Sequence, residues 1–163
     1  MRKVIIVFVI FMGFMDNIMA QNPDYLFMIE NACKAPSGHN TQPWLFKIRE
    51  SEIDIYPDLS KELPVVDPSH RELFVSLGCA TENLCIAAQE KGYQTEVKVI
   101  KDSFIRVLLI KDKKKQFDSS LFSQIAVRQT NRSVYDGKEI PKDSISLLKA
   151  TSNEPSISIY FYK

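Results

Sequence analysis

Ten consecutive residues, 35–44 (APSGHNTQPW), bring five hydrogen-bonding side chains together with two prolines and a glycine. Such a loop packs poorly into a core, but its hydroxyl, amide and backbone N–H groups can hold the polar edge of a ring. The candidate binding residues of this loop are Pro36, Ser37, Gly38, Asn40 and Gln42, of which the last four carry the polar groups. On composition alone, an ordinary connector between a helix and a strand is the favoured interpretation.

A second stretch could bind a phosphate group. Arg128 and Arg132 lie four residues apart, with Thr130 between them. Guanidinium groups donate forked pairs of N–H groups to phosphate oxygens, and a hydroxyl adds a neutral donor. Arginine pairs are also common on solvated surfaces, and by themselves these residues favour that interpretation.

Other chemistry has less support. The two histidines, His39 and His70, have no cysteine or carboxylate at metal-ligand spacing, so we expect no metal site and an exposed His70. The three cysteines cannot all pair with one another. Cys79 and Cys85 would share one helix and point to different sides of it, so they are interpreted as small apolar core residues.

Hydrophobic periodicity and turn residues predict the elements that must position these groups. We expect helices over 23–34, 67–91, 119–128 and 141–150, and strands over 44–48, 52–56, 95–100, 105–110 and 157–162. Trp44 opens the first strand and is expected to pack in the core. The fold class is therefore α+β, with an antiparallel or mixed sheet packed against one long helix.

The long helix is predicted to begin at Asp67, as its N-cap, with Pro68 in the first turn, and to stop at Gly92. Its apolar residues extend around much of the cylinder, so we expect it to be buried on several sides. Gly78 costs about 1 kcal/mol in mid-helix. This cost makes sense if a neighbouring helix or a bound ligand must approach the backbone at Gly78, and a closely packed helix is the favoured explanation.

Residues 1–20 are typical of a secretory signal peptide. Arg2 and Lys3 precede a twelve-residue apolar run, and Ala20 is a small residue at the cleavage position. We expect export to the periplasm or envelope and a mature chain that begins at Gln21. The alternative is an uncleaved helix that anchors the chain to the membrane. Cleavage would leave 19 basic and 19 acidic side chains, a balance that argues against binding nucleic acid.

Residues 35–44 resemble the Ala-Pro-Ser-x-x-Asn-x-Gln-Pro-Trp signature of the nitroreductase family of FMN-dependent oxidoreductases, and most closely its duplicated Acg-like branch. The long-helix segment resembles the Acg-like pattern as well. The resemblance implies a nitroreductase-like fold in which Ser37, Gly38 and Asn40 face the FMN ring or its ribityl chain. It also implies that Arg128, Thr130 and Arg132 grip the FMN phosphate. No residue need act as a catalytic acid or base, because the cofactor carries the electron transfer.

The same resemblance implies how the chain is organised. Residues 21–126 would form a first lobe and residues 127–163 the start of a second, truncated one, so the fold would be incomplete. Either the chain is a truncated product, or two copies associate to rebuild the site. We expect self-association through the uncovered central-helix residues Leu77, Gly78, Leu84 and Cys85. The expected function is that of an FMN-binding oxidoreductase that exchanges electrons with a small molecule. The alternatives are a protein that binds or sequesters flavin without turnover, and an inactive truncated product.

Overall fold

The computed structural model describes residues 22–101, 103–112, 120–150 and 160. Its contacts divide the chain into two units, which meet between Gln129 and Thr130. The signal peptide predicted over residues 1–20 lies outside the described residues, and so does the predicted strand over 157–162, apart from Tyr160. The division of the chain into two lobes of one larger protein stays a prediction.

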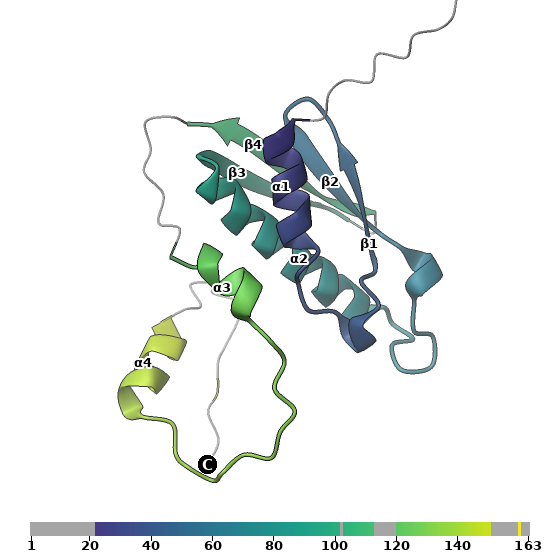
Figure 1. Ribbon diagram of the computed structural model, residues 1–163. Helices are drawn as coiled ribbons and strands as arrows, with labels where there is room; N and C mark the ends of the chain where they lie inside the picture. Colours follow the sequence, from purple (N-terminus) through teal and green to yellow (C-terminus); the bar gives the residue numbers. More distant parts are fainter. Residues whose placement is uncertain (1–21, 102, 113–119, 151–159, 161–163) are drawn as a thin grey trace, which may run out of the picture. The chain divides into compact units, whose positions relative to one another are not determined.

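The described part of the first unit is an α+β structure, as predicted (Figure 1). In chain order it contains α1 (Pro23–Ala32), the 3₁₀ turn η1 (Gly38–Asn40), β1 (Trp44–Ile48), β2 (Glu52–Pro57), the 3₁₀ turn η2 (Leu59–Lys61), α2 (Arg71–Glu90), β3 (Tyr93–Ile100), β4 (Phe104–Lys111) and α3 (Phe122–Val127). The second unit contains α4 (Lys142–Ala150).

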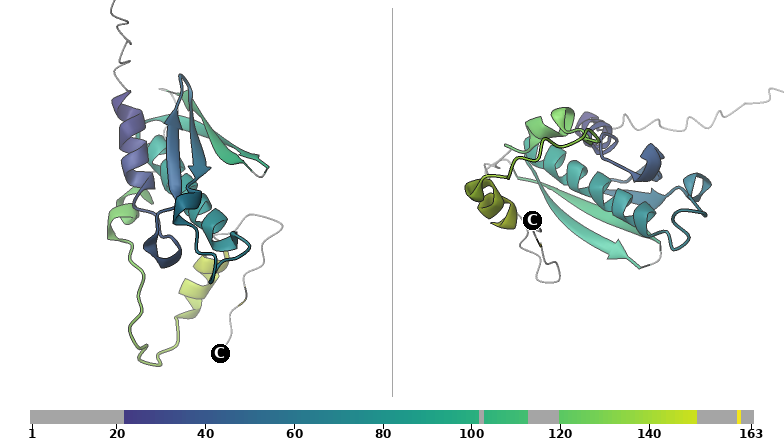
Figure 2. Two further views of the ribbon diagram at one scale, coloured as in Figure 1. Left: turned by 90° about the vertical axis from the view of Figure 1, so that its right-hand side faces the viewer. Right: turned by 90° about the horizontal axis from the view of Figure 1, so that it is seen from below.

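The four strands form one antiparallel sheet in the order β1-β2-β4-β3. Two hairpins, β1–β2 and β3–β4, are joined edge to edge by the pairing of Ile53 with Val107 and of Ile55 with Ile105. Alternation along β2 and β4 turns Ile53, Ile55 and Val107 toward the helices, where all three are fully buried. The helices of this unit cover one face of the sheet (Figure 2).

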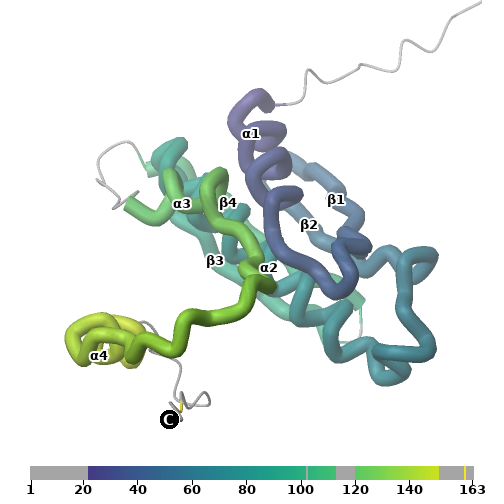
Figure 3. Tube along the Cα trace, turned by 60° about the horizontal axis from the view of Figure 1, so that its bottom comes forward, coloured from purple at the N-terminus to yellow at the C-terminus, as the bar shows by residue number. Residues whose placement is uncertain are grey.

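Helices α1 and α2 pack side by side over that face (Figure 3). The Asn22 side chain caps α1 by accepting the Asp24 N–H at 3.0 Å. Met28 of α1 and Leu77 and Leu84 of α2 have no exposed surface. These side chains and Trp44 of β1, which is buried as predicted, belong to one hydrophobic core.

The start of the long helix differs from the prediction. Helix α2 begins at Arg71, and the residue before it, His70, has a left-handed backbone (φ 56°). Asp67 still satisfies the helix end, because its Oδ2 accepts the Leu73 N–H at 2.9 Å. Burial tends to raise the pKa of Asp67, but hydrogen bonds from backbone N–H groups outweigh it and lower that pKa. His70 is only partly exposed, and its Nε2 lies 2.8 Å from Glu62 Oε2.

Candidate functional site

The backbone of the predicted ring-binding loop is unusual. His39, Asn40 and Gln42 all have positive φ angles, of 49°, 58° and 51°. A residue other than glycine pays about 1 kcal/mol or more for this left-handed conformation, although asparagine tolerates it better than most. Three such residues within four positions persist only where surrounding contacts hold them, and they are typical of sites that bind ligands.

Hydrogen bonds within the loop and from η2 hold this conformation. The Ser37 hydroxyl accepts the Gln42 N–H at 2.9 Å, and the Thr41 hydroxyl donates to the Gly38 carbonyl at 3.0 Å. Lys61 of η2 donates to the Gln42 carbonyl at 3.2 Å. Protein groups alone therefore supply hydrogen bonds that hold the loop in this conformation.

The loop also lies close against α2. A Cβ atom added to Gly38 would lie only 2.9 Å from Oε2 of Glu72. The Gly38 N–H donates to the hydroxyl of Ser76 at 3.2 Å. The nearest atom to such a Cβ is the mobile end of the Glu72 side chain, so the hydrogen bond to Ser76 is the firmer contact between the loop and the helix.

A groove of about 250 Å³ lies between the loop and the first half of α2. Its lining residues are Pro36, Ser37 and Gly38 from the loop and Arg71, Glu72, Val75, Ser76 and Cys79 from α2. Val75 and Cys79 supply apolar surface, whereas the loop residues and the two charged side chains supply polar groups. Arg71, near the start of α2, is thus part of the wall.

The structure brings three of the five predicted loop residues, Pro36, Ser37 and Gly38, to the groove. Asn40 and Gln42 are exposed, and their side-chain amides make no hydrogen bond to the residues that the structure describes. Both amides are therefore free to bond a ligand that lies along the loop.

The predicted phosphate-binding residues are divided between the units. Arg128 belongs to the first unit, where its Nη2 atom lies 3.4 Å from the carbonyl oxygen of Lys34, next to the start of the loop. Thr130 and Arg132 belong to the second unit and are exposed there. Their joint role in binding a phosphate stays a prediction.

A second, larger groove of about 440 Å³ has mainly apolar walls. Phe74, Leu77 and Gly78 of α2 line it, together with six residues of the β3–β4 hairpin: Val99, Ile100, Lys101, Ser103, Phe104 and Ile105. No described atom lies within 4 Å of a Cβ added to Gly78. The expectation that a helix packs closely against Gly78 is therefore wrong, because this groove lies there.

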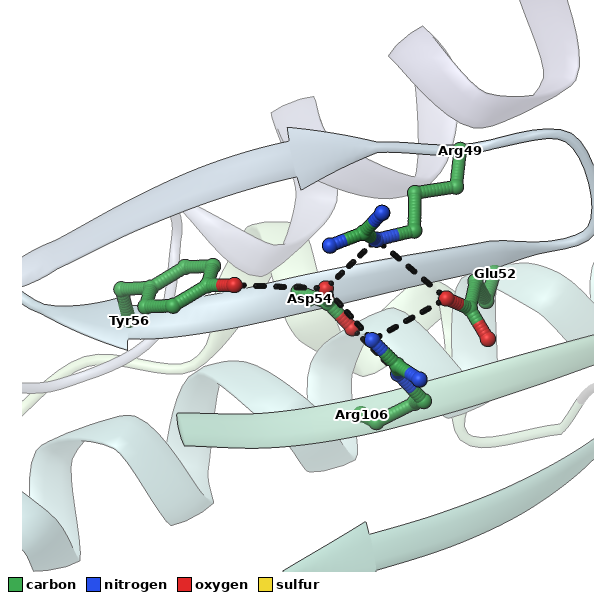
Figure 4. A network of polar contacts seen from close by, with 5 residues as sticks. All are labelled: Arg49, Glu52, Asp54, Tyr56 and Arg106. Atoms are coloured by element: carbon green, nitrogen blue, oxygen red, sulfur yellow. Dashed lines mark hydrogen bonds and ion pairs between the residues drawn. The ribbon is translucent and has the colours of Figure 1, made fainter. Parts of the chain in front are cut away.

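A buried charge network on the sheet escaped the sequence analysis (Figure 4). Asp54 of β2 has no exposed surface, yet it accepts hydrogen bonds from Arg106 Nε (2.7 Å), Arg106 Nη2 (3.0 Å) and Arg49 Nε (2.8 Å). Glu52 pairs with the same two arginines, and Tyr56 donates weakly to Asp54 at 3.4 Å. The Arg106 and Arg49 guanidinium groups lower the pKa of Asp54.

The available sequence signal was an aspartate between two isoleucines in a strand, with its side chain on the opposite face from theirs. Because protein groups already occupy both oxygens of Asp54, the network stabilises the sheet and offers no free acid or base.

The cysteines of the described residues are free thiols. Burial raises the pKa of Cys85 to about 11, and it also raises the pKa of Cys33. Among the described residues no three histidine, cysteine, aspartate or glutamate side chains gather as a metal site would require. None of the helices described is both long and apolar enough to cross a membrane.

Sequence comparison gives the class of protein. No family model matches the chain. It is 31% identical over 127 residues to a Mycobacterium tuberculosis protein named "Putative NAD(P)H nitroreductase Rv3131", an alignment that covers 73% of this chain and 36% of that protein. It is 29% identical over 69 residues to the M. tuberculosis nitroreductase homologue acg, covering 42% of this chain and 21% of that one.

A crystal structure of a nitroreductase family protein from Streptococcus pneumoniae matches with a TM-score of 0.43 and 16% identity, over 76% of this chain and 87% of that one.

The sequence similarity supports the assignment of the chain to the nitroreductase family, which the resemblance of residues 35–44 predicted. The chain spans about a third of the length of the M. tuberculosis protein Rv3131. Members of this family generally depend on a flavin and act on small redox substrates.

Proposed function

We propose that the chain contributes to an FMN-dependent, nitroreductase-like oxidoreductase, and that the groove between residues 36–38 and α2 receives an edge of the flavin ring. One observation carries this proposal. The three left-handed residues His39, Asn40 and Gln42 form a rigid turn beside that groove. Left-handed residues held by surrounding contacts cluster at ligand sites, where a few placed polar groups orient the ligand.

The residues at the groove suit a flavin chemically. A flavin ring has apolar faces and an edge of carbonyl oxygens and ring nitrogens. Val75 and Cys79 offer apolar surface to a face, while the Ser37 hydroxyl can donate and the Asn40 and Gln42 amides can donate or accept. These residues would bind and orient the ring.

For the phosphate of FMN we propose Arg128, which belongs to the first unit. The contact of Arg128 with the Lys34 carbonyl supports this for Arg128, because it brings a guanidinium group near the first residues of the loop. The contact is long and Arg128 is exposed, so its remaining N–H groups are available to an anion.

When bound, FMN would supply the electron transfer between a donor and a small-molecule acceptor. The chain's own residues would hold the ring and limit the access of water to one side of it. No side chain in the groove is assigned a role as nucleophile or general base.

Self-association is a further part of the proposal. Phe74, Val97 and Val99 expose 45%, 46% and 75% of their surface near the larger groove. Exposed apolar groups that lie together favour association. Of the central-helix residues expected to face a partner, Leu77, Leu84 and Cys85 are buried within the unit, whereas Gly78 is exposed. The exposed apolar groups near the larger groove offer a partner a further surface.

The test is reconstitution with FMN and, in parallel, with riboflavin, which lacks the phosphate. We expect saturable binding of FMN, followed by flavin fluorescence, and weaker binding of riboflavin. Light scattering on the same dilution series checks whether association and binding rise together. Anaerobic reduction of the bound flavin by NADH or NADPH distinguishes an oxidoreductase from a protein that only holds flavin. Absence of FMN binding at any protein concentration would refute the proposal.

A further inference from the structure

The side chain of Ser76 links α2 to the loop of residues 36–42. Ser76 is 97% buried, with a relative exposure of 3%, and its hydroxyl accepts the Gly38 N–H at 3.2 Å. We propose that Ser76 is a positioning residue that sets the conformation of residues 37–42 for the flavin, an inference that rests on the proposed function.

The hydroxyl of Ser76 is held in place from both sides. It donates to the Glu72 carbonyl oxygen at 2.7 Å while it accepts from Gly38. Its one proton is therefore directed into the helix, and a lone pair faces the loop. This arrangement fixes the distance between the Gly38 backbone and α2.

Gly38 in turn determines where the left-handed turn begins. The Gly38 carbonyl accepts the Thr41 N–H at 3.1 Å and the Thr41 hydroxyl at 3.0 Å. The Asn40 N–H donates to the Ser37 carbonyl at 3.0 Å. A shift of the peptide between Ser37 and Gly38 would therefore move the whole turn. Loss of the Ser76 hydroxyl would leave the Gly38 N–H without its acceptor in a partly buried place.

The same helix supplies a matched control. Thr81 is also buried, and its hydroxyl donates to the Leu77 carbonyl at 2.8 Å, four residues earlier, just as Ser76 does to Glu72. Thr81 contacts no residue of the loop through its hydroxyl in the described part of the chain. Thr81→Val and Ser76→Ala each remove one helix-internal bond, and only Ser76→Ala also removes the link to Gly38.

The experiment compares wild type, Ser76→Ala and Thr81→Val with two readouts. Amide hydrogen exchange, measured by NMR without FMN, should become about tenfold faster at Gly38 in Ser76→Ala and stay unchanged in Thr81→Val. The dissociation constant for FMN should rise about tenfold in Ser76→Ala and less than twofold in Thr81→Val. Thermal unfolding, followed by Trp44 fluorescence, should give similar midpoints for the two variants.

The outcomes separate the inference from the proposed function. If wild type does not bind FMN, the proposed function fails, and Gly38 exchange still decides whether Ser76 sets the loop. The inference would be overturned if Ser76→Ala had the same Gly38 exchange rate and the same FMN affinity as wild type. So would faster exchange without loss of affinity, or a Ser76→Ala protein that is unfolded while Thr81→Val is folded, since Ser76 would then serve stability alone.

Discussion

Replacing Asp54 with asparagine should destabilise the first unit more than replacing an exposed carboxylate of the same sheet with its amide. The substitution keeps the size of the side chain but removes the charge that three guanidinium N–H groups share, at 2.7, 2.8 and 3.0 Å. The asparagine NH₂ group would also face donors, so at least one bond would become a repulsion.

The size of the destabilisation depends on how deeply Asp54 and its two arginine partners are buried. Breaking a fully buried ion pair costs about 3–5 kcal/mol. Asp54 is fully buried, but the side chains of Arg49 and Arg106 remain 40% and 27% exposed and can recover hydration. We therefore expect Asp54→Asn to lower the free energy of unfolding by about 2 kcal/mol, which is roughly 8 °C in the midpoint for a unit of this size.

The assay is thermal and urea unfolding followed by the fluorescence of Trp44, the single tryptophan of the chain, which is buried in β1. The pKa of Asp54 is lower in the folded unit than its ordinary value of 3.8. Its contribution is therefore complete above that ordinary value and lost as the pH falls through the lower, folded pKa. The difference between wild type and Asp54→Asn should be full at pH 7 and shrink below about pH 4.

Glu96→Gln is the matched control, because Glu96 forms an exposed pair with Lys98 on β3 at 3.2 Å. It should move the midpoint by no more than about 2 °C. The reasoning would be refuted if Asp54→Asn behaved like Glu96→Gln at pH 7. A loss that stayed constant between pH 7 and pH 2 would equally refute the role of the charge.

Three other predictions concern the cofactor, the thiols and the N-terminus. Arg128→Ala should weaken FMN binding about tenfold, while Lys98→Ala, which alters an exposed pair on β3, should leave the dissociation constant unchanged; equal losses would remove Arg128 from the site. Cys79, which lines the groove, should react with a thiol reagent more slowly when FMN is present, whereas Cys85, buried and with a pKa raised to about 11, should react only on unfolding; a Cys79 rate that ignores FMN would argue against the proposed groove. Protein recovered from the native envelope should begin at Gln21, and a mass that retains residue 1 would contradict cleavage.

Elements that depend on neighbouring residues could be predicted from the sequence. The Asn22 cap, both hairpins and the stop at Gly92, whose φ is +75°, follow from local preferences that act within a few positions. The family could likewise be inferred from ten residues, because the types and order in residues 35–44 are distinctive without any fold.

Tertiary contacts decided the rest. Helix α2 begins at Arg71 and not directly after Asp67. Asp67 is not the N-cap residue; it lies six residues before Leu73 and accepts the Leu73 N–H from there. The order of the strands and the Asp54 network depend on β2 meeting β4, which joins Asp54 to Arg106 across 52 positions of sequence.

The left-handed turn at His39, Asn40 and Gln42 has a similar origin. Local preference disfavours it, and hydrogen bonds from elements distant in sequence, Lys61 of η2 and Ser76 of α2, help to hold it. The sequence by itself determined which residues could contact a flavin and which local elements carry them. Only the tertiary structure decided that Ser37 and Gly38 share a groove with α2. The groove depends on contacts between residues far apart in the sequence, and local sequence patterns do not reveal such contacts.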